Sequence, residues 1–417
     1  MARGNFSERM MRIAQLIGPV DDYISRSAWS EHREDPEACD FMFGNPQEMP
    51  LEGFTAALQK WLAPQNKDWF AYKNNEPGPR QVVADSLRDR LGLAFEPEDI
   101  FLTPGVFGAL PLALAAAVDP ADEVIYISPP WFFYETMIMH RGGTPVRARC
   151  HPETHDLDLE AIERALTPRT RAVIVNSPNN PTGRIYPRET LHALADLLRR
   201  RSAEIGQTIF IISDESYRRI LFDGRSFHSP VEVYGPTFML YTYGKTLLTP
   251  GQRIGYLALP PDFPDREVMR LMVNAAQYIN GYAFPNALLQ HALGDLEELS
   301  IDIPRLQRKR DWMVSALREQ GYQLHTPEAT FYLLVRSPLE DDVRFTEMLS
   351  ERGVYCLPGS MFDTPGYFRV SLTATEDMIE RALPVFSAVM QAAAQPGGRP
   401  APAPVPRTRP AGPASSR

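Results

Sequence analysis

Short apolar segments rich in valine and isoleucine alternate along this 417-residue chain with longer segments that have helical spacing. Strands are predicted at 122–130, 170–178, 208–216 and 238–245, and helices at 108–118, 157–167 and 188–201. Strands that alternate with helices form right-handed βαβ units, so the pattern predicts an α/β fold with a mostly parallel sheet flanked by helices. Ligands bind such sheets just past the carboxyl ends of the strands.

The pattern changes after about residue 302, where a helix at 303–321 leads to a strand-like segment at 330–337. A chain of this length also exceeds one typical single-core domain. We therefore predict an N-terminal segment that joins the small domain at 1–50, a large domain at 51–302 that contains the parallel sheet, a smaller α+β domain at 303–391 and a disordered tail at 392–417. The tail is predicted from its Pro-, Ala- and Arg-rich composition, which leaves almost nothing to bury.

Composition argues against several classes of protein. The net charge of -9 gives no reason to expect a nucleic-acid partner. No apolar run approaches the roughly 20 residues that span a bilayer, and the charged N-terminus lacks the apolar core of a secretory signal. Cys39, Cys150 and Cys356 are far apart, without metal or redox spacing. We therefore expect a cytoplasmic protein with no membrane partner and no metal site.

One lysine stands out in a chain that otherwise uses arginine. Only five lysines occur among the 43 basic residues, and Lys245 is the only lysine from residue 74 to residue 308. An amine at this point suggests amine chemistry, although a single lysine must fall somewhere by chance. Lys245 and Asp214 lie at the ends of predicted strands and the turn at 179–183 follows another, where functional side chains are expected.

Singly these stretches are weak signals, because Asn, Pro and Gly are common in turns and an aspartate after a strand is often a helix cap. Four motifs follow one another along the chain: Asn-Pro-Thr-Gly at 180–183, Asp-x-x-Tyr at 214–217, Lys245, and Gly-Gln-Arg-Ile-Gly-Tyr at 251–256. Together they resemble the fold-type I pyridoxal-phosphate enzymes, specifically the class I/II aminotransferases, over roughly residues 40–390. The resemblance implies an aspartate-aminotransferase-like fold, pyridoxal 5'-phosphate as cofactor, and transfer of an amino group from an L-amino acid to a 2-oxo acid.

The resemblance also implies roles around the cofactor ring. Lys245 is expected to bond to the cofactor aldehyde and to carry a proton, which requires a neutral amine. Asp214 is expected to pair with the ring nitrogen and so keep the ring an electron sink. Tyr217 and Asn180 are expected to hydrogen-bond to the phenolate oxygen. Trp131 is expected to stack on the ring, unless it is simply a core aromatic.

The phosphate group needs its own ligands, and helix N-termini supply free N–H groups and partial positive charge. The implied ligands are the backbone of Gly105, Val106 and Phe107, the Thr242 hydroxyl, the Arg253 guanidinium and, from a neighbouring subunit, Tyr72. If Tyr72 acts in this way, the active unit is a homodimer with shared active sites. Gly244 stands where many members of the family have Ser or Thr, so one hydroxyl donor is expected to be missing.

For the substrate, the resemblance assigns Arg369 to the α-carboxylate by a bidentate contact. Gly44 and Asn180 are expected to lie beside the same group. The simpler interpretations are a surface salt bridge for Arg369 and a turn for Gly44. Phe107 occupies a position where some aspartate-preferring members have Lys, which favours a neutral or aromatic substrate. Aspartate stays possible, because a cation could arrive from elsewhere or from the other subunit.

Two alternatives remain open from the sequence. A β-lyase, decarboxylase, cyclase or oxidase could use the same scaffold, because the choice of reaction depends on which Cα bond lies perpendicular to the ring. A regulator with an aminotransferase-like sensor domain would need a DNA-binding module first. Only about 40 residues, not strongly basic, precede the segment that begins Phe-Met-Phe-Gly-Asn-Pro.

Overall fold

The structure is a computed structural model that describes residues 6–281 and 285–394. Most of the predicted disordered tail, 395–417, lies outside the described residues. The predicted tail begins at residue 392, and residues 392 and 393 belong to the last helix, α14 (Glu376–Ala393). Within the described ranges, no helix is both long enough and apolar enough to cross a membrane.

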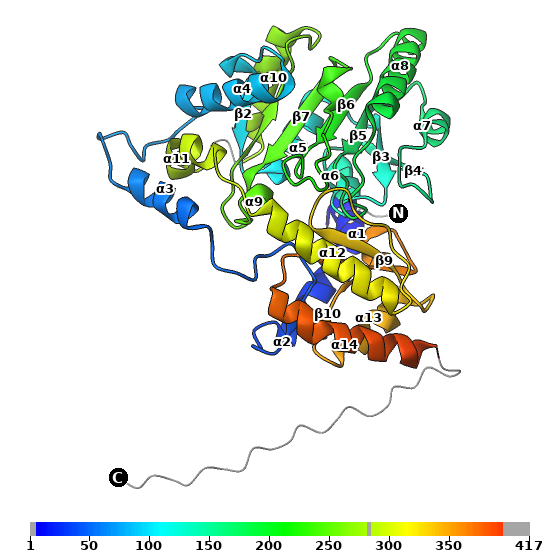
Figure 1. Ribbon diagram of the computed structural model, residues 1–417. Helices are drawn as coiled ribbons and strands as arrows, with labels where there is room; N and C mark the ends of the chain where they lie inside the picture. The colour runs from blue at the N-terminus through cyan, green and yellow to red at the C-terminus, as the bar shows by residue number, and fades with distance from the viewer. Residues whose placement is uncertain (1–5, 282–284, 395–417) are drawn as a thin grey trace.

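A seven-stranded sheet forms the centre of the molecule, in the order β2-β8-β7-β6-β5-β3-β4 (Figure 1). Its strands are β2 (Ile100–Thr103), β3 (Glu123–Ser128), β4 (Thr144–Arg149), β5 (Thr170–Asn176), β6 (Phe210–Asp214), β7 (Thr237–Thr242) and β8 (Gly255–Ala258). Only β8 runs antiparallel to its neighbours β2 and β7. The predicted α/β fold with a mostly parallel sheet is confirmed.

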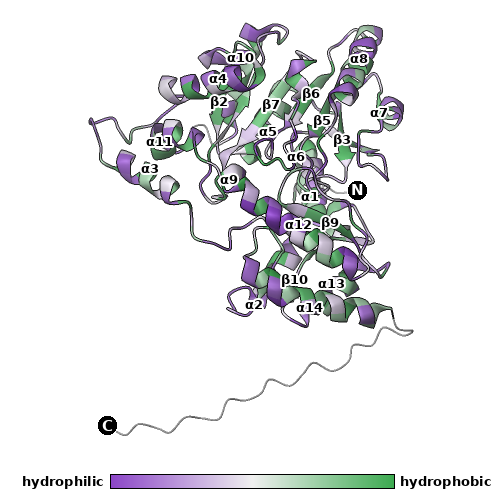
Figure 2. Ribbon diagram, in the orientation of Figure 1, coloured by the Kyte–Doolittle hydropathy of each residue, from purple (hydrophilic) through white to green (hydrophobic). Residues whose placement is uncertain are grey.

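Helices cover both faces of this sheet because side chains alternate along each strand. In β3, Val124 and Tyr126 pack beneath α5, whereas Ile125 and Ile127 pack beneath α8. The face beneath α5 (Val106–Ala117) is also covered by α6 (Tyr134–His140) and α10 (Arg266–Ile279). The opposite face is covered by α7 (Leu159–Ala165), α8 (Arg188–Ile205), α4 (Pro77–Leu91) and α11 (Ala287–Glu297). The helix α3 (Glu52–Leu62) packs against α11. In Figure 2 the central strands are largely hydrophobic and the surrounding helices show hydrophilic stretches.

A smaller antiparallel sheet, in the order β11-β12-β9, lies below the central sheet in Figure 1. It consists of β9 (Tyr332–Arg336), β11 (Leu357–Pro358) and β12 (Tyr367–Ser371), and packs with α12 (Ile303–Glu319), α13 (Asp342–Ser350) and α14. From the N-terminal segment come α1 (Glu8–Arg26), α2 (Ala28–His32) and β1 (Cys39–Asp40), which pairs in parallel with β10 (Val354–Tyr355). Short 3₁₀ helices lie at Pro97–Asp99, Pro230–Glu232 and Gly359–Phe362.

The predicted strand that contains Lys245 is shorter in the structure than expected. The strand expected at 238–245 ends at Thr242, and Tyr243–Thr246 form the short helix α9. Thr242 causes the change because its side chain accepts a hydrogen bond from the Gly244 N–H and caps the helix. Lys245 therefore projects from a helical turn rather than from an extended strand.

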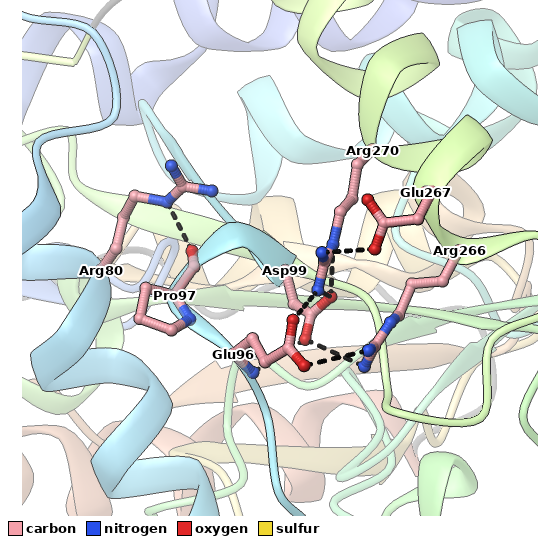
Figure 3. Close-up of polar contacts among 7 residues, drawn as sticks. All are labelled: Arg80, Glu96, Pro97, Asp99, Arg266, Glu267 and Arg270. Atoms are coloured by element: carbon pink, nitrogen blue, oxygen red, sulfur yellow. Dashed lines mark hydrogen bonds and ion pairs between the residues drawn. The ribbon is translucent and has the colours of Figure 1, made fainter.

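A buried carboxylate anchors α10 beside β2 (Figure 3). The guanidinium of Arg270 donates to Asp99 at 2.6 and 2.9 Å and to Glu96 at 2.6 Å. Arg266 reaches the same two carboxylates at 3.4 and 3.2 Å. Buried charges need such pairing, since an isolated one is costly to desolvate. The cluster fixes which side of α10 faces the sheet and therefore which side faces outward.

Candidate active site

A cavity of about 810 Å³ opens at the carboxyl ends of β5, β6 and β7. Its lining combines the last residues of these strands, Asn176, Asp214 and Thr242, with Tyr332 and Arg369 from β9 and β12. The edge of the central sheet where ligands are expected therefore faces the small sheet across this cavity.

Most of the residues predicted from the sequence line this one cavity. They are Gly44, Val106, Phe107, Trp131, Asn180, Asp214, Tyr217, Thr242, Lys245, Arg253 and Arg369. Gly105 lies beside it as the N-cap of α5. Tyr72 is not among the described lining residues of its own chain; it lies between α3 and α4 and is 96% exposed.

The Asp214 carboxylate is buried among hydrogen-bond donors at the end of β6. The Tyr134 hydroxyl donates to Oδ2 at 2.6 Å, while Ser216 donates to Oδ1 through its hydroxyl at 2.6 Å and its N–H at 3.1 Å. Burial raises the pKa of Asp214, and these donors and the charge of Lys245 oppose that rise. Because its described hydrogen-bond partners are all neutral, the carboxylate would be stabilised further by a cationic N–H group.

The Lys245 amine stands over aromatic rings rather than beside an acid. Its Nζ lies 5.8 Å from the ring centroids of both Tyr217 and Phe331. Within the described chain its side chain forms no ion pair. An amine placed in this way keeps its lone pair available once it has lost its proton.

Two phenols, Tyr217 and Tyr332, lie next to each other beside this lysine. Both are buried, their rings meet edge to face with centroids 6.0 Å apart, and the Tyr217 hydroxyl donates to the Tyr332 oxygen. Burial raises the pKa of Tyr217. Burial alone would also raise the pKa of Tyr332, but the cations Arg369 and Lys245 outweigh it and lower that pKa.

Gly105, Thr242 and Arg253 converge at one end of the cavity. Gly105 has a φ of 74°, and an added Cβ there would stand 3.0 Å from Arg253 Nη2 and 3.0 Å from Thr242 Oγ1. The first intrahelical donors of α5 are the N–H groups of Gly108 and Ala109. The N–H groups of Val106 and Phe107 precede them, have no acceptor within the helix and are available to bind an anion. The Gly105 N–H is not, because it donates to the Thr103 carbonyl oxygen at 2.7 Å.

The Arg369 guanidinium is buried without an acidic partner among the described residues. Its Nη1 donates to Asn180 Oδ1 and its Nη2 to the Met42 carbonyl oxygen, both at 3.1 Å, while Nε has no acceptor. Gly44 lies close by, where an added Cβ would stand only 2.6 Å from the Tyr332 hydroxyl. The simpler interpretation of Arg369 as a surface salt bridge is wrong, because the side chain is buried.

Sequence reasoning missed several polar residues at this site, among them Tyr134, Asn176, Ser216 and Tyr332. Asn176 binds the Asp214 carbonyl oxygen through Nδ2 at 3.0 Å and accepts from the Asn180 N–H at 2.9 Å. Asn176 and Ser216 lie at strand ends, so their position in the predicted sheet was an available signal. Tyr332 had none, because only tertiary packing brings β9 to the cavity.

The charges that line the cavity do not cancel within the described chain. Arg253 donates to the carbonyl oxygens of Pro250 and Pro104, at 2.6 and 3.2 Å, and has no acidic partner there. The same holds for Lys245 and Arg369, whereas Asp214 is the one acidic residue among the described lining residues. Uncompensated buried charge is costly. The arrangement therefore suits a ligand with anionic groups at two places and a cationic N–H at a third.

The sequence pattern of the family described as aminotransferase class I and II matches residues 39–386 of this chain. The chain belongs to that family. The aspartate/prephenate aminotransferase of Thermus thermophilus is 33% identical over 382 residues, which is 88% of this chain and 94% of that protein. The aromatic-amino-acid aminotransferase 2 of Thermococcus litoralis is 28% identical over 327 residues, 75% of this chain and 81% of that protein.

Solved structures agree with this assignment. An aminotransferase from Eubacterium rectale has a TM-score of 0.84 at 28% identity and covers 94% of this chain and all of that one. The aspartate aminotransferase of Thermotoga maritima has a TM-score of 0.80 at 27% identity, over 93% of this chain and 100% of that one. The predicted family, fold, activity and cofactor are confirmed: this protein is a pyridoxal-phosphate-dependent aminotransferase.

The cavity of this aminotransferase fits its cofactor. The end formed by α5, Thr242 and Arg253 could hold a phosphate group, because it combines free N–H groups, a hydroxyl and an unpaired guanidinium. Asp214 could accept the ring N–H, and Trp131 lines the cavity with its ring partly exposed. Arg369 then remains for the carboxylate of a substrate.

Proposed function

We propose that this aminotransferase binds its cofactor and both substrates in the cavity described above, with the roles that the sequence predicts for its residues. One observation carries the proposal. Apart from the exposed Arg33, three cations without acidic partners and one carboxylate without a cationic partner line a single cavity in the described chain. This set of charges is the one needed to bind the phosphate, the ring nitrogen and the amine-reactive carbon of pyridoxal phosphate and the carboxylate of an amino acid.

Pyridoxal phosphate, when bound, supplies a carbon that bonds to amines and a ring that accepts the electron pair left at the substrate Cα. Asp214 would hold a proton on the ring nitrogen, and Tyr134 and Ser216 hold Asp214 in place. Lys245 Nζ removes the proton from the substrate Cα. Tyr217 and Asn180 would hydrogen-bond to the phenolate oxygen of the ring, and Tyr332 accepts a hydrogen bond from Tyr217.

Arg369 orients the substrate. Its Nε has no acceptor among the described residues, so a carboxylate that binds there satisfies a buried donor instead of displacing an existing partner. A bidentate contact fixes the plane of the carboxylate and therefore the direction of the Cα–H bond. If that contact holds the carboxylate near the plane of the cofactor ring, the Cα–H bond rather than the bond to the carboxyl group would stand perpendicular to the ring, and transamination would be favoured over decarboxylation.

The test is an assay with one amino acid and one 2-oxo acid in which both products are counted. We expect one amino acid formed for each amino donor consumed. Arg369→Gln is expected to lower kcat/KM by about 100-fold or more, because a charge-assisted bidentate contact is lost. The exposed Arg336, on the neighbouring strand β9, provides the control Arg336→Gln, which should keep its activity. Release of ammonia or carbon dioxide without use of the 2-oxo acid would contradict transamination.

We also propose that the active unit is a homodimer in which Tyr72 reaches the cavity of the partner subunit. Tyr72 is almost fully exposed and does not line the cavity of its own chain. The outward side of α10 supports an interface, because Val268, Leu271 and Ile279 are 56%, 71% and 74% exposed. Exposed apolar patches of this kind mark protein–protein contacts. The ion-pair cluster in Figure 3 holds the opposite side of α10 against the sheet region.

The association is tested by analytical ultracentrifugation of Leu271→Arg. A charge buried in an interface is costly, so the variant is expected to sediment as a monomer and to lose most of its activity. Ser315→Arg places the same charge on an exposed position of α12 and should leave both properties unchanged. A wild-type protein that is monomeric and fully active would rule the shared site out.

We further propose a cytoplasmic location. The support is that Cys39, Cys150 and Cys356 form no disulfide in the structure, as expected in a reducing compartment.

A further inference from the structure

The short helix α9 carries Lys245, and its two end residues do not face the cavity. Gly244 and Lys245 line the cavity, whereas Tyr243 and Thr246 are fully buried and are not among the described lining residues. Residues three apart share one face of a helical turn, so Tyr243 and Thr246 form the side of α9 that packs into the protein. The contacts of that side therefore decide where Lys245 points.

Both end residues of α9 are tied to the end of α11 and the segment that follows it. The Tyr243 hydroxyl donates to Oε2 of Glu297, the last residue of α11, at 2.5 Å. The Ile301 N–H donates to the Thr246 carbonyl oxygen at 2.9 Å. The Thr246 hydroxyl also hydrogen-bonds to the Tyr241 hydroxyl of β7 at 2.8 Å. The helix α9 is therefore held at both of its ends.

The Glu297 carboxylate is itself fixed in place. It is buried, and its Oε1 accepts from the Ser86 hydroxyl of α4 at 2.6 Å and from Arg219 Nη1 at 3.3 Å. Burial raises the pKa of Tyr243, and the Glu297 carboxylate raises it further, so the phenol keeps its proton and acts as the donor. Because hydrogen bonds to charged acceptors are stronger than those between neutral groups, Glu297 gives Tyr243 a strong and stationary partner.

We propose that Glu297 is a positioning residue for Lys245, which it holds through Tyr243 and α9. The inference rests on the proposed function, because it takes Lys245 as the amine that bonds to the cofactor and removes the proton at Cα. Neither Glu297 nor Tyr243 is among the described residues that line the cavity, so their effect on the reaction must pass through α9. A displacement of about 1 Å in a reacting group can lower a rate by about 100-fold.

The experiment compares Tyr243→Phe with Tyr234→Phe, which also removes a buried hydroxyl. The Tyr234 hydroxyl donates to the Ile209 carbonyl oxygen at 2.6 Å, and Tyr234 is not a described lining residue of the cavity. Both variants are expected to lower the melting temperature by similar amounts. Only Tyr243→Phe should lower kcat, by about 10-fold, while KM for the amino donor changes less than about 2-fold because Arg369 is untouched.

A second measurement on the holoenzyme needs no substrate. The circular dichroism of the bound cofactor reports how asymmetrically the protein holds it. That signal should weaken in Tyr243→Phe and persist in Tyr234→Phe, because only the first change releases the helix that carries Lys245.

Glu297 itself is tested by the pair Glu297→Gln and Glu297→Ala. Glutamine keeps an oxygen that can accept from Tyr243, so Glu297→Gln should retain more of kcat and of the cofactor signal than Glu297→Ala. Equal losses in the two variants would contradict a role through this hydrogen bond. If Glu297→Ala does not fold, the comparison of Tyr243→Phe with Tyr234→Phe still decides.

Other outcomes would overturn the inference. If Tyr243→Phe lowers only the melting temperature, as Tyr234→Phe does, the contact merely supports the fold. If KM rises while kcat stays, the contact affects substrate binding rather than Lys245. In both cases Lys245→Ala would still be inactive, and the proposed function would stand. Turnover by Lys245→Ala would instead show that the proposed function itself fails.

Discussion

Lys245→Ala is expected to lower kcat/KM by about 10⁴-fold or more, because it removes both the amine that bonds to the cofactor and the base at Cα. No other lysine lines the described cavity that could replace it. Lys60→Ala is a matched control, since this exposed lysine pairs with Asp295 on the surface and should not affect turnover.

A second measurement tests the covalent role directly. Borohydride reduces carbon–nitrogen double bonds, so treatment of wild-type holoenzyme should leave the cofactor mass on the peptide that contains Lys245. The Lys245→Ala protein should carry no such mass. Turnover close to the wild-type value, or cofactor attached to another lysine, would show that the assignment is wrong.

Asp214→Asn is expected to retain the cofactor but to lower kcat by about 10³-fold, because a preorganised charge that stabilises the reacting state is lost. The phosphate end of the cavity does not involve Asp214, so binding there should persist. Kinetics and the amount of cofactor that remains after gel filtration separate these effects.

Ser216→Ala is the control for Asp214→Asn. It removes one hydroxyl donor, 2.6 Å from the carboxylate, yet leaves the negative charge in place. We expect a loss of about 10-fold, the size of one hydrogen bond to a charged group. A Ser216→Ala effect as large as that of Asp214→Asn would mean that the position of the carboxylate, rather than its charge, matters most. Near-normal activity of Asp214→Asn would refute the role of the residue.

Local sequence predicted those parts of the site that lie next to a strand. Asp214 ends β6, and Lys245 follows β7 by three residues, so strand prediction placed both at the binding edge. The extent of β7 was overestimated, because the Thr242 cap that starts α9 depends on one hydrogen bond rather than on a periodic pattern. The helices α10 and α11 were not predicted, nor were strands β2, β4 and β8.

Family resemblance extended the prediction to Arg369 and Gly44, whose local sequence is uninformative. The structure places both at the cavity and shows why Gly44 must be small, since Phe331 and Tyr332 leave no room for a Cβ. It does not bring Tyr72 to the cavity of the same chain. The role of Tyr72 therefore depends on the proposed dimer.

The sequence by itself determined the alternation of strands and helices, the strand ends that carry Asp214 and Lys245, and the free helix N-terminus after Gly105. These follow from periodicity and from local hydrogen bonds between residues a few positions apart. Tertiary structure alone decided that Arg369 binds Asn180, 189 positions away, and that Tyr134 holds Asp214, 80 positions away. Contacts over such separations depend on how elements pack, which no local pattern encodes.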